Sequence, residues 1–240
     1  MGLRLEPSAA ARERRLERLL AERGLQRSDA RLASVVEDAQ LVGSLGLSSI
    51  PVPWEEARAS RGTGGGPPAL VALRRARGAV APAEPVTLGA IRAWHAALAG
   101  PAGFRRLELD PSSASGTGAD RPSAPVEFIE SRLEDLVAWL QAAGSDALRP
   151  EQKAAVALAR IAEVRPFDDA NGRVSRLAAA HVMDRAGLAP PILVAGDDAR
   201  LRNTLPAAFR LETGPLVDLI HEASGRALDV MIQSLERGLA

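Results

Sequence analysis

The sequence lacks cysteine and has almost no lysine. Without cysteine, disulfides, zinc sites made of thiolates and thiol nucleophiles are excluded. Lys153 is the only lysine, so the basic charge comes almost wholly from arginine. The chain also lacks net charge, because 30 basic residues balance 30 acidic ones. Neither nucleic acid nor an anionic membrane is therefore favoured as a partner, and a charged ligand must be met by a local group of side chains.

Long hydrophobic runs are absent as well. No apolar run approaches the length of a membrane span, and residues 1–7 offer no stretch long enough for a signal peptide. The chain has 240 residues, of which 46% are hydrophobic and 25% charged, enough to bury a sizeable core. We therefore expect a folded cytoplasmic protein.

Most of the chain has the apolar periodicity of amphipathic helices, so we expect a mainly α fold. The expected helices cover residues 7–24, 28–41, 69–77, 87–99, 126–143, 150–164, 171–186, 198–205, 206–212 and 215–237. Gly43 and Gly46 end the second helix, which we expect to pair with the first. His95, on the helix over residues 87–99, is interpreted as a structural or surface histidine rather than a catalytic one.

The glycine-rich segment 61–68 lacks the Gly-Lys-Ser/Thr ending of a phosphate loop, so we interpret it as a connector. It divides the chain into three predicted parts. Residues 1–60 form an N-terminal helical arm, residues 61–86 a connector and a helix, and residues 87–240 the core.

The clearest β pattern lies at residues 103–110, where apolar and charged residues alternate with the period of a half-exposed strand. A serine- and glycine-rich turn follows at residues 111–121, which cannot pack into a core. We expect this strand and its loop to form a flap over a helical body.

The densest polar cluster is residues 164–176, with the sequence VRPFDDANGRVSR. A helix that begins at Asn171 would present free amide groups and a partial positive charge, which suit an anion such as phosphate. Gly172 lets the backbone approach an oxygen closely. Ala170 instead adds a methyl group and loses freedom at positive φ. We therefore predict a phosphate site at the start of this helix.

Charged side chains flank the predicted anion site. Arg173 and Arg176 are three residues apart, so they share one helix face and can hold phosphate oxygens with their guanidinium groups. Asp169 can hold a magnesium ion that bridges two phosphates. Each residue has a simpler interpretation, because Asp169 can act as a helix cap or ion-pair partner and the arginines as surface charges. The spacing of all three together favours a ligand site.

Residues 165–176 resemble the signature of the Fic (Fic/Doc, Fido) family, in which a histidine, a phenylalanine, an acidic residue, Gly-Asn-Gly and two arginines occur in fixed order. Two positions depart from it. Arg165 stands where the family has its catalytic histidine, and Ala170 stands where it has the first glycine. The resemblance extends over residues 87–224 and includes a Gly-Phe-Arg at the start of the expected flap.

The resemblance implies a Fic-type helical bundle with a small β-hairpin flap that pairs with an extended segment of a target protein. The flap residues would be Phe104, Arg105, Arg106, Leu107, Glu108 and Leu109. Members of the family commonly transfer AMP from ATP, with Mg²⁺, to a protein hydroxyl, and the signature histidine removes the hydroxyl proton.

The resemblance also implies a role for each signature residue. Asp169 would bind the metal, and Ala170, Asn171 and Gly172 would cradle the anion. Arg173 and Arg176 would contact phosphate.

Arg165 cannot replace the histidine as a base, because an arginine stays protonated at physiological pH. Asp168 is adjacent and can in principle accept a proton, but we favour altered or absent chemistry.

Many Fic proteins are restrained by a helix that carries Ser or Thr, three residues and Glu. The loose match here is residues 33–38, in which Glu37 is a candidate inhibitory residue for Arg176 and is otherwise a surface glutamate.

Three functions remain open from the sequence. The first is a degenerate Fic-domain protein that binds ATP, another nucleotide or another phosphate ligand, with Mg²⁺, and binds a protein target through the flap. The second is an active Fic-type transferase with altered chemistry, which moves a nucleotidyl or phospho group without the histidine. The third is a helical protein whose signature has drifted. A homodimer is also left open.

Overall fold

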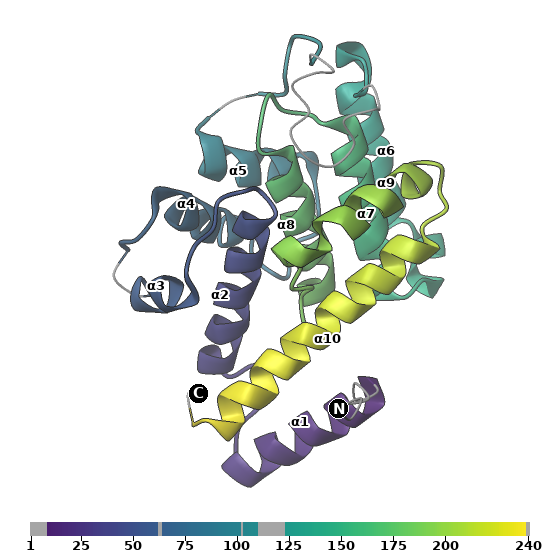
Figure 1. The fold of residues 1–240 in the computed structure, drawn as a ribbon. Coiled ribbons are helices and arrows are strands. Elements are labelled where there is room, and N and C mark those ends of the chain that lie inside the picture. Colours follow the sequence, from purple (N-terminus) through teal and green to yellow (C-terminus); the bar gives the residue numbers. More distant parts are fainter. Residues whose placement is uncertain (1–8, 62–63, 102, 110–122, 239–240) are drawn as a thin grey trace.

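The computed structural model describes residues 9–61, 64–101, 103–109 and 123–238, and within these ranges the chain is helical and contains no strand (Figure 1). The α-helices are α1 (Ala9–Arg23), α2 (Ala30–Gly46), α3 (Trp54–Ala59), α4 (Pro68–Arg77), α5 (Leu88–Ala99), α6 (Ile129–Gln141), α7 (Pro150–Val164), α8 (Asn171–Arg185), α9 (Asp198–Phe209) and α10 (Gly214–Glu236). Short 3₁₀ turns are η2 (Val126–Phe128), η3 (Ala143–Ala147) and η4 (Ala195–Asp197). The mainly α prediction is confirmed.

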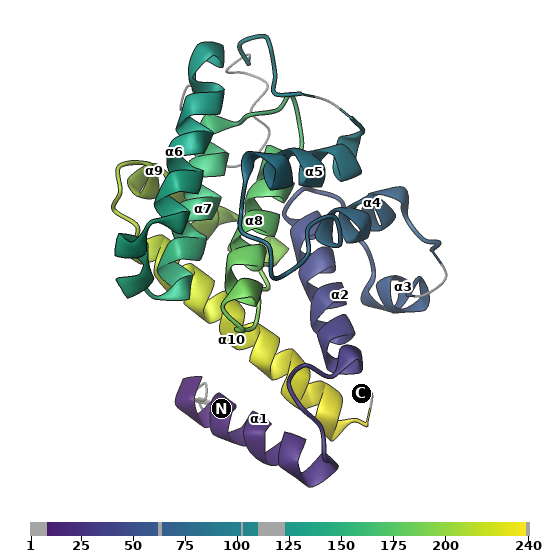
Figure 2. The same cartoon turned by 180° about the vertical axis from the view of Figure 1, so that it is seen from behind.

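The antiparallel pair α7 and α8 lies at the centre of the molecule, with α5, α6 and α2 around it and the long α10 crossing below (Figures 1 and 2). Small residues allow the pair to pack closely: Ala157 on α7 and Ala178 on α8 are fully buried. Trp94 of α5 joins the same apolar cluster. The pair therefore provides a rigid support for the loop that connects its two helices, which is residues 165–170.

Helix α2 continues to Gly46, past the end that the sequence predicts at residue 41. Gly43 does not stop the helix. A Cβ at this position would lie 2.1 Å from the Leu193 carbonyl oxygen, so the glycine allows close packing against the segment before η4. The five additional residues bring the C-terminal end of α2 to α8.

Two other differences concern short helical segments. The sequence predicts a break at Pro206, but α9 runs through this proline to Phe209. Leu205, Ala208 and Phe209 are buried in one apolar cluster, and their burial keeps the segment helical despite the backbone donor that proline lacks. Helix α3 was not predicted, because its six residues are too few to show a period.

The strand predicted over residues 103–110 is not formed by residues 103–109, and Asp110 with the turn at 111–121 lies outside the described residues. The physical reason is Arg105, whose side chain is buried. Its Nε donates to the Arg165 carbonyl oxygen at 2.8 Å, and its Nη2 donates to that of Ala124. Its backbone N–H donates to the Pro166 carbonyl oxygen at 2.9 Å. The segment is therefore held against the signature loop instead of pairing as a strand.

The other flap residues have different environments. Phe104 is partly buried under the Arg92 guanidinium, which lies 4.3 Å from its ring centre. Arg106, Leu107 and Glu108 are exposed, and Leu109 is partly so. No helix in the described part of the chain is long and apolar enough to span a membrane.

Candidate functional site

The signature loop, residues 165–170, leads into the first turn of α8 with an unusual backbone conformation. Ala170 precedes the helix with φ 58° and ψ 4°, the left-handed region that favours glycine. The Asn171 side chain fixes the loop, since its Oδ1 accepts from Phe167 N–H at 2.9 Å and its Nδ2 donates to the Phe167 carbonyl at 2.7 Å. The asparagine therefore holds the loop in place and leaves the start of α8 without a side-chain cap.

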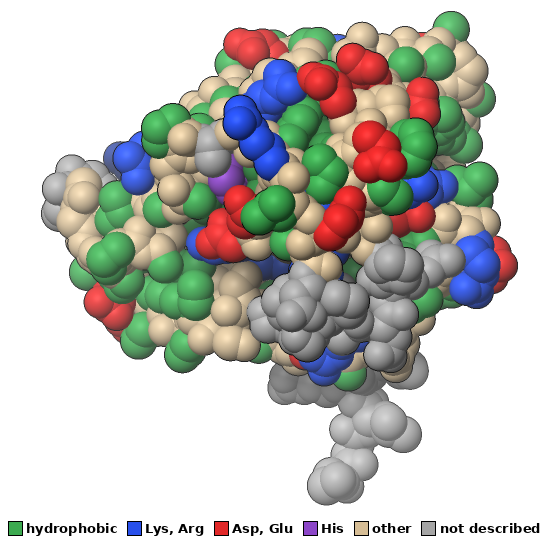
Figure 3. Space-filling view, turned by 90° about the horizontal axis from the view of Figure 1, so that it is seen from above, with side chains coloured by type: hydrophobic (Ala, Val, Ile, Leu, Met, Phe, Trp, Pro, Cys, Tyr) green, Lys and Arg blue, Asp and Glu red, His purple; other side chains and the backbone are tan. Residues whose placement is uncertain are grey.

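The first amide groups of α8 are free. Val174 N–H donates to the Ala170 carbonyl oxygen, but the N–H groups of residues 171–173 donate to no acceptor in the described parts of the chain. Three unpaired amides and the aligned peptide dipoles make this helix end suitable for an anion. Figure 3 views the molecule from the signature end, where acidic and basic side chains are mixed.

Arg173 and Asp169 lie beside these amides. The Arg173 Nη2 atom is 3.8 Å from Asp169 Oδ2, and the Asp169 carboxylate is 66% exposed. The same carboxylate is 3.6 Å from His95 Nε2, too far for a hydrogen bond. Among the described residues, no cluster of three metal-binding side chains occurs. Asp169 is thus an accessible carboxylate next to a cation and free amides.

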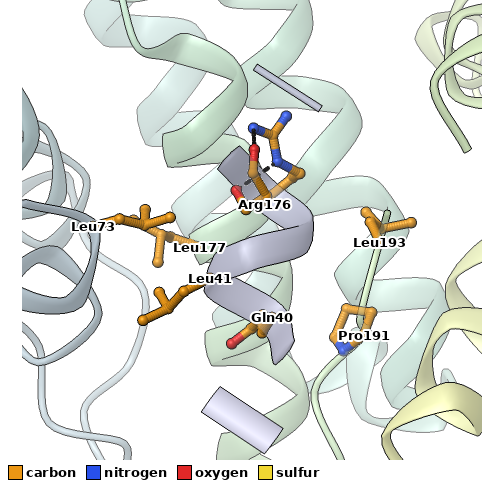
Figure 4. A pocket seen from close by; sticks show the side chains of 8 residues that line it. Gln40, Leu41, Leu73, Arg176, Leu177, Pro191 and Leu193 are labelled. Atoms are coloured by element: carbon orange, nitrogen blue, oxygen red, sulfur yellow. Dashed lines mark hydrogen bonds between the residues drawn. The ribbon is translucent and has the colours of Figure 1, made fainter. Parts of the chain in front are cut away.

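Arg176 has a different environment, because its side chain is buried against the C-terminal end of α2 (Figure 4). Its Nε donates to Ser44 Oγ at 2.9 Å, and its Nη2 donates to the Ser44 carbonyl at 2.8 Å and to Ser48 Oγ at 2.7 Å. Burial, with the nearby Arg173 charge, lowers the pKa of Arg176 to about 10. The guanidinium is committed to α2, although the sequence predicts it as a phosphate contact.

Gly172 belongs to this arrangement. A Cβ at this position would meet Arg176 Nη1 at 3.1 Å. The glycine thus provides space for the buried guanidinium, in addition to leaving the backbone of the first turn accessible.

Glu37 does not contact Arg176. Burial raises its pKa, and the opposing charges that act on it are Arg77 and Arg74. The predicted pair of Glu37 with Arg176 is therefore replaced by Ser44 and Ser48. The sequence did not predict these two contacts, because the helix was expected to end at residue 41. Gly43 and Gly46 are the only hint, since glycine permits close helix packing as well as helix termination.

Arg165 ends α7 in the left-handed region, with φ 48° and ψ 63°, and is partly buried. Burial, followed by repulsion from Arg105, lowers the pKa of Arg165. An arginine remains a cation at neutral pH even so. The position that begins the signature therefore adds positive charge and offers no proton acceptor.

An aromatic stack supports the signature loop from below. His95 lies parallel to Phe167, with ring centres 3.8 Å apart, and Phe104 tilts against Phe167 at 5.6 Å. His95 is 4% exposed, and neither ring nitrogen has a hydrogen-bond partner. Burial lowers its pKa, although the Asp169 charge opposes this. His95 is therefore a buried neutral ring under the loop, in accord with its structural interpretation.

These features define a helical protein in which the loop between two central helices leads into a helix start with free amide groups. Residues 85–183 match the model of the Fic/DOC family, and this segment of the chain is a Fic domain. Among curated proteins, the chain is 31% identical over 119 residues to protein adenylyltransferase fic-1 of Caenorhabditis briggsae, covering 50% of this chain and 23% of that protein. It is 31% identical over 131 residues to protein adenylyltransferase Fic of Culex quinquefasciatus, covering 54% and 24%. The chain thus spans about a quarter of the length of these relatives.

Solved structures have the same fold. Fic-1 (residues 134–508) of Caenorhabditis elegans superposes with a TM-score of 0.72 at 19% identity, over 96% of this chain and 74% of that one. A Fic domain containing signaling protein from Bacteroides thetaiotaomicron gives 0.71 at 17% identity, over 93% and 97%. The Fic-type helical bundle predicted from the sequence is confirmed, while the β-hairpin is not formed by the described residues.

Proposed function

We propose that this Fic-domain protein binds a nucleotide through its phosphates at the start of α8 and has impaired or absent AMP transfer. The observation that carries the proposal is the set of three unpaired amides at residues 171–173. Arg173 lies at the same helix end, so a phosphate there would meet both backbone donors and a guanidinium. The adenylyltransferase names of the relatives support ATP as the first nucleotide to test.

Impaired transfer follows from the lack of a histidine base at this site. Arg165 occupies the first signature position, and the chain has three histidines, none of which opens onto the first turn of α8. His95 is buried, His181 Nε2 is 2.7 Å from the Glu84 carbonyl oxygen, and His221 lies beside Glu151. Loss of a general base costs about 10² to 10⁴-fold in rate. We therefore propose that binding, rather than nucleotidyl transfer, is the main property of the site.

A magnesium ion fits the residues present. Mg²⁺ is commonly held by one or two carboxylates together with substrate phosphates, and Asp169 supplies one exposed carboxylate beside the free amides. When bound, the ion would neutralise phosphate charge. Arg173 would keep its place next to the same phosphates, because its guanidinium already lies on the Asp169 side of the helix end.

A protein target is proposed to bind at the segment that follows Gly103. Leu107 is 77% exposed, the largest fraction among the exposed large apolar side chains of the described residues. Arg106 and Glu108 flank it and are exposed too. Arg105 anchors this segment directly to the Arg165 and Pro166 carbonyl groups, so a bound target would lie next to the signature loop.

Calorimetry with ATP and Mg²⁺ tests the binding proposal. We expect heat of binding for the natural chain, a large loss for Arg173→Ala, and no change for Arg132→Ala, an exposed arginine on α6. No heat with ATP, UTP or GTP would contradict the proposal and leave a structural role.

Labelled nucleotides test the chemistry. Cell extract incubated with the protein and labelled ATP, UTP, GTP or CDP-choline should acquire no covalent label. The double variant Arg165→His, Ala170→Gly should acquire label from ATP on itself or in the extract. Label that depends on the natural chain would support an active transferase with altered chemistry instead.

A further inference from the structure

A pocket of ≈ 370 Å³ lies at the end of the α7 and α8 pair opposite to the signature. It is open to solvent and is lined by the start of α7, the end of α8, the end of α6 with η3, and the segment before α5. These elements meet at the far end of the pair from the loop that connects α7 to α8 (Figure 1). Helix α7 has 15 residues, so at a rise of 1.5 Å per residue the two sites are separated by roughly 20 Å.

The walls of this pocket are partly apolar. Val86, Leu140, Leu148 and Val182 come from four separate segments of the chain and line one space. Ligand pockets typically have volumes of about 300–1,000 Å³, so the pocket is large enough for a small organic molecule. Its apolar wall would exclude water from the body of such a molecule and favour a ligand with a hydrocarbon or aromatic part.

Two cations line the same pocket. Lys153, the only lysine of the chain, has its side chain 17% exposed, and its Nζ is 2.9 Å from Asp146 Oδ1. Arg185 donates from Nε to the Ala83 carbonyl at 3.3 Å, and its terminal nitrogens make no hydrogen bond within the described ranges. Asp146 is 78% exposed and forms the only acidic part of the lining. The charged side chains of the pocket thus carry one net positive charge.

We propose that this pocket binds a small organic carboxylate with an apolar body. The carboxylate would accept hydrogen bonds from the terminal nitrogens of Arg185 and from the remaining donors of Lys153. Its apolar part would lie against Leu140 and Val182. A neutral ligand would bury the two cations without an added partner, which is costly, and Asp146 disfavours an ion with several negative charges.

Benzoate and hexanoate are the probes, and benzamide and hexanamide are their uncharged counterparts of similar shape. In calorimetry with the full chain, we expect a carboxylate to bind about tenfold or more tightly than its amide, because charge-assisted hydrogen bonds are lost with the amide. The double variant Lys153→Met, Arg185→Met should lose this preference. Arg132→Met, on the exposed face of α6, should keep it.

Ala186→Trp provides a second variant, because Ala186 is an exposed residue of the lining and a tryptophan there fills the pocket while both cations remain. We expect this variant to lose carboxylate binding and to retain its helical circular dichroism. Arg173→Met should leave carboxylate binding unchanged, since it lies at the signature end. Absence of binding by both carboxylates, equal binding of carboxylate and amide, or binding that survives Ala186→Trp would overturn the proposal.

Discussion

The first and second turns of α8 each carry an arginine, and the two arginines have opposite environments. Arg173, in the first turn, lies next to three unpaired amides and an exposed carboxylate. Arg176, one turn further, is buried and donates three hydrogen bonds to Ser44 of α2 and to Ser48 just after it. Only the first is placed to meet a ligand in this conformation. The difference shows that residue spacing on a helix sets direction, whereas the neighbouring helix decides whether a side chain binds ligand or protein.

The largest expected effect separates the two arginines by stability. Arg176→Met removes three charge-assisted hydrogen bonds and leaves Ser44 Oγ without its donor, while the Ser48 hydroxyl still donates to the Ser44 carbonyl at 3.1 Å. We therefore expect the free energy of unfolding to fall by about 3 kcal/mol. Urea denaturation measures this change. Arg173→Met should stay within about 1 kcal/mol of the natural chain, since its ion pair is long and partly exposed. An equal loss in both variants would show that the two turns do not differ in this way.

The next effect separates the two arginines by binding. Arg173→Met removes a guanidinium next to the free amides, and a charge-assisted hydrogen bond contributes about 1.5–3 kcal/mol, so we expect ATP affinity to fall by about 10 to 100-fold. Calorimetry at constant salt measures it. Asp169→Asn serves as a matched test of the metal, because it should weaken binding with Mg²⁺ more than without it. If Arg173→Met binds ATP as the natural chain does, the phosphates do not contact the Arg173 guanidinium.

A smaller effect concerns the backbone that leads into the first turn. Ala170 has φ 58°, a conformation that costs an alanine roughly 1–2 kcal/mol and costs glycine little. Glycine also gives the unfolded chain more entropy, which offsets part of this gain. We therefore expect Ala170→Gly to stabilise the fold by about 1 kcal/mol. Ala138→Gly, at an exposed helical position of α6, should instead destabilise it by about 1 kcal/mol. Thermal unfolding of the two variants compares the signs, and destabilisation by both would mean that Ala170 is not strained.

The smallest effect is a pH dependence of the free energy of unfolding, which originates at His181, outside the first two turns of α8. Burial lowers the pKa of His181, so the folded state keeps this ring neutral while the unfolded state binds a proton below about pH 6.5. Stability contributed by the neutral ring is therefore lost as the pH falls through this value. Between pH 7.5 and 6 we expect His181 to account for a loss of less than about 1 kcal/mol in the free energy of unfolding. His181→Gln should reduce the slope in urea denaturation at the two pH values; a slope that stays the same would assign it to other groups.

Helices that carry their own start and stop residues were predicted well from the sequence. Residues 150–164 were expected as a helix, and α7 has these bounds, with Pro150 in its first turn. Helix α5 is another case: a helix was expected to begin at Thr87, and the Thr87 hydroxyl accepts from Ala90 N–H at 3.0 Å as the N-cap of α5. Helix capping depends on residues that are close in the sequence, so it can be predicted without the tertiary structure.

What the sequence could not predict depends on contacts between distant segments. Gly43 reads as a helix end, but its lack of a side chain serves packing against Leu193. Arg105 reads as an exposed position of a strand, yet its guanidinium is buried beside the Arg165 carbonyl. The start of α8 at Asn171 was predicted from the local sequence, whereas the partners of Arg176 lie on α2 and just after it, about 130 residues earlier in the chain.

The most direct test of the proposed site is an NMR titration of the backbone amides with ATP and Mg²⁺. We expect the amide signals of Asn171, Gly172 and Arg173 to shift with ATP concentration, while those around Arg185 at the other end of α8 do not. Binding of ATP that leaves these three amide signals in place would show that the free amides of the first turn do not hold the phosphates.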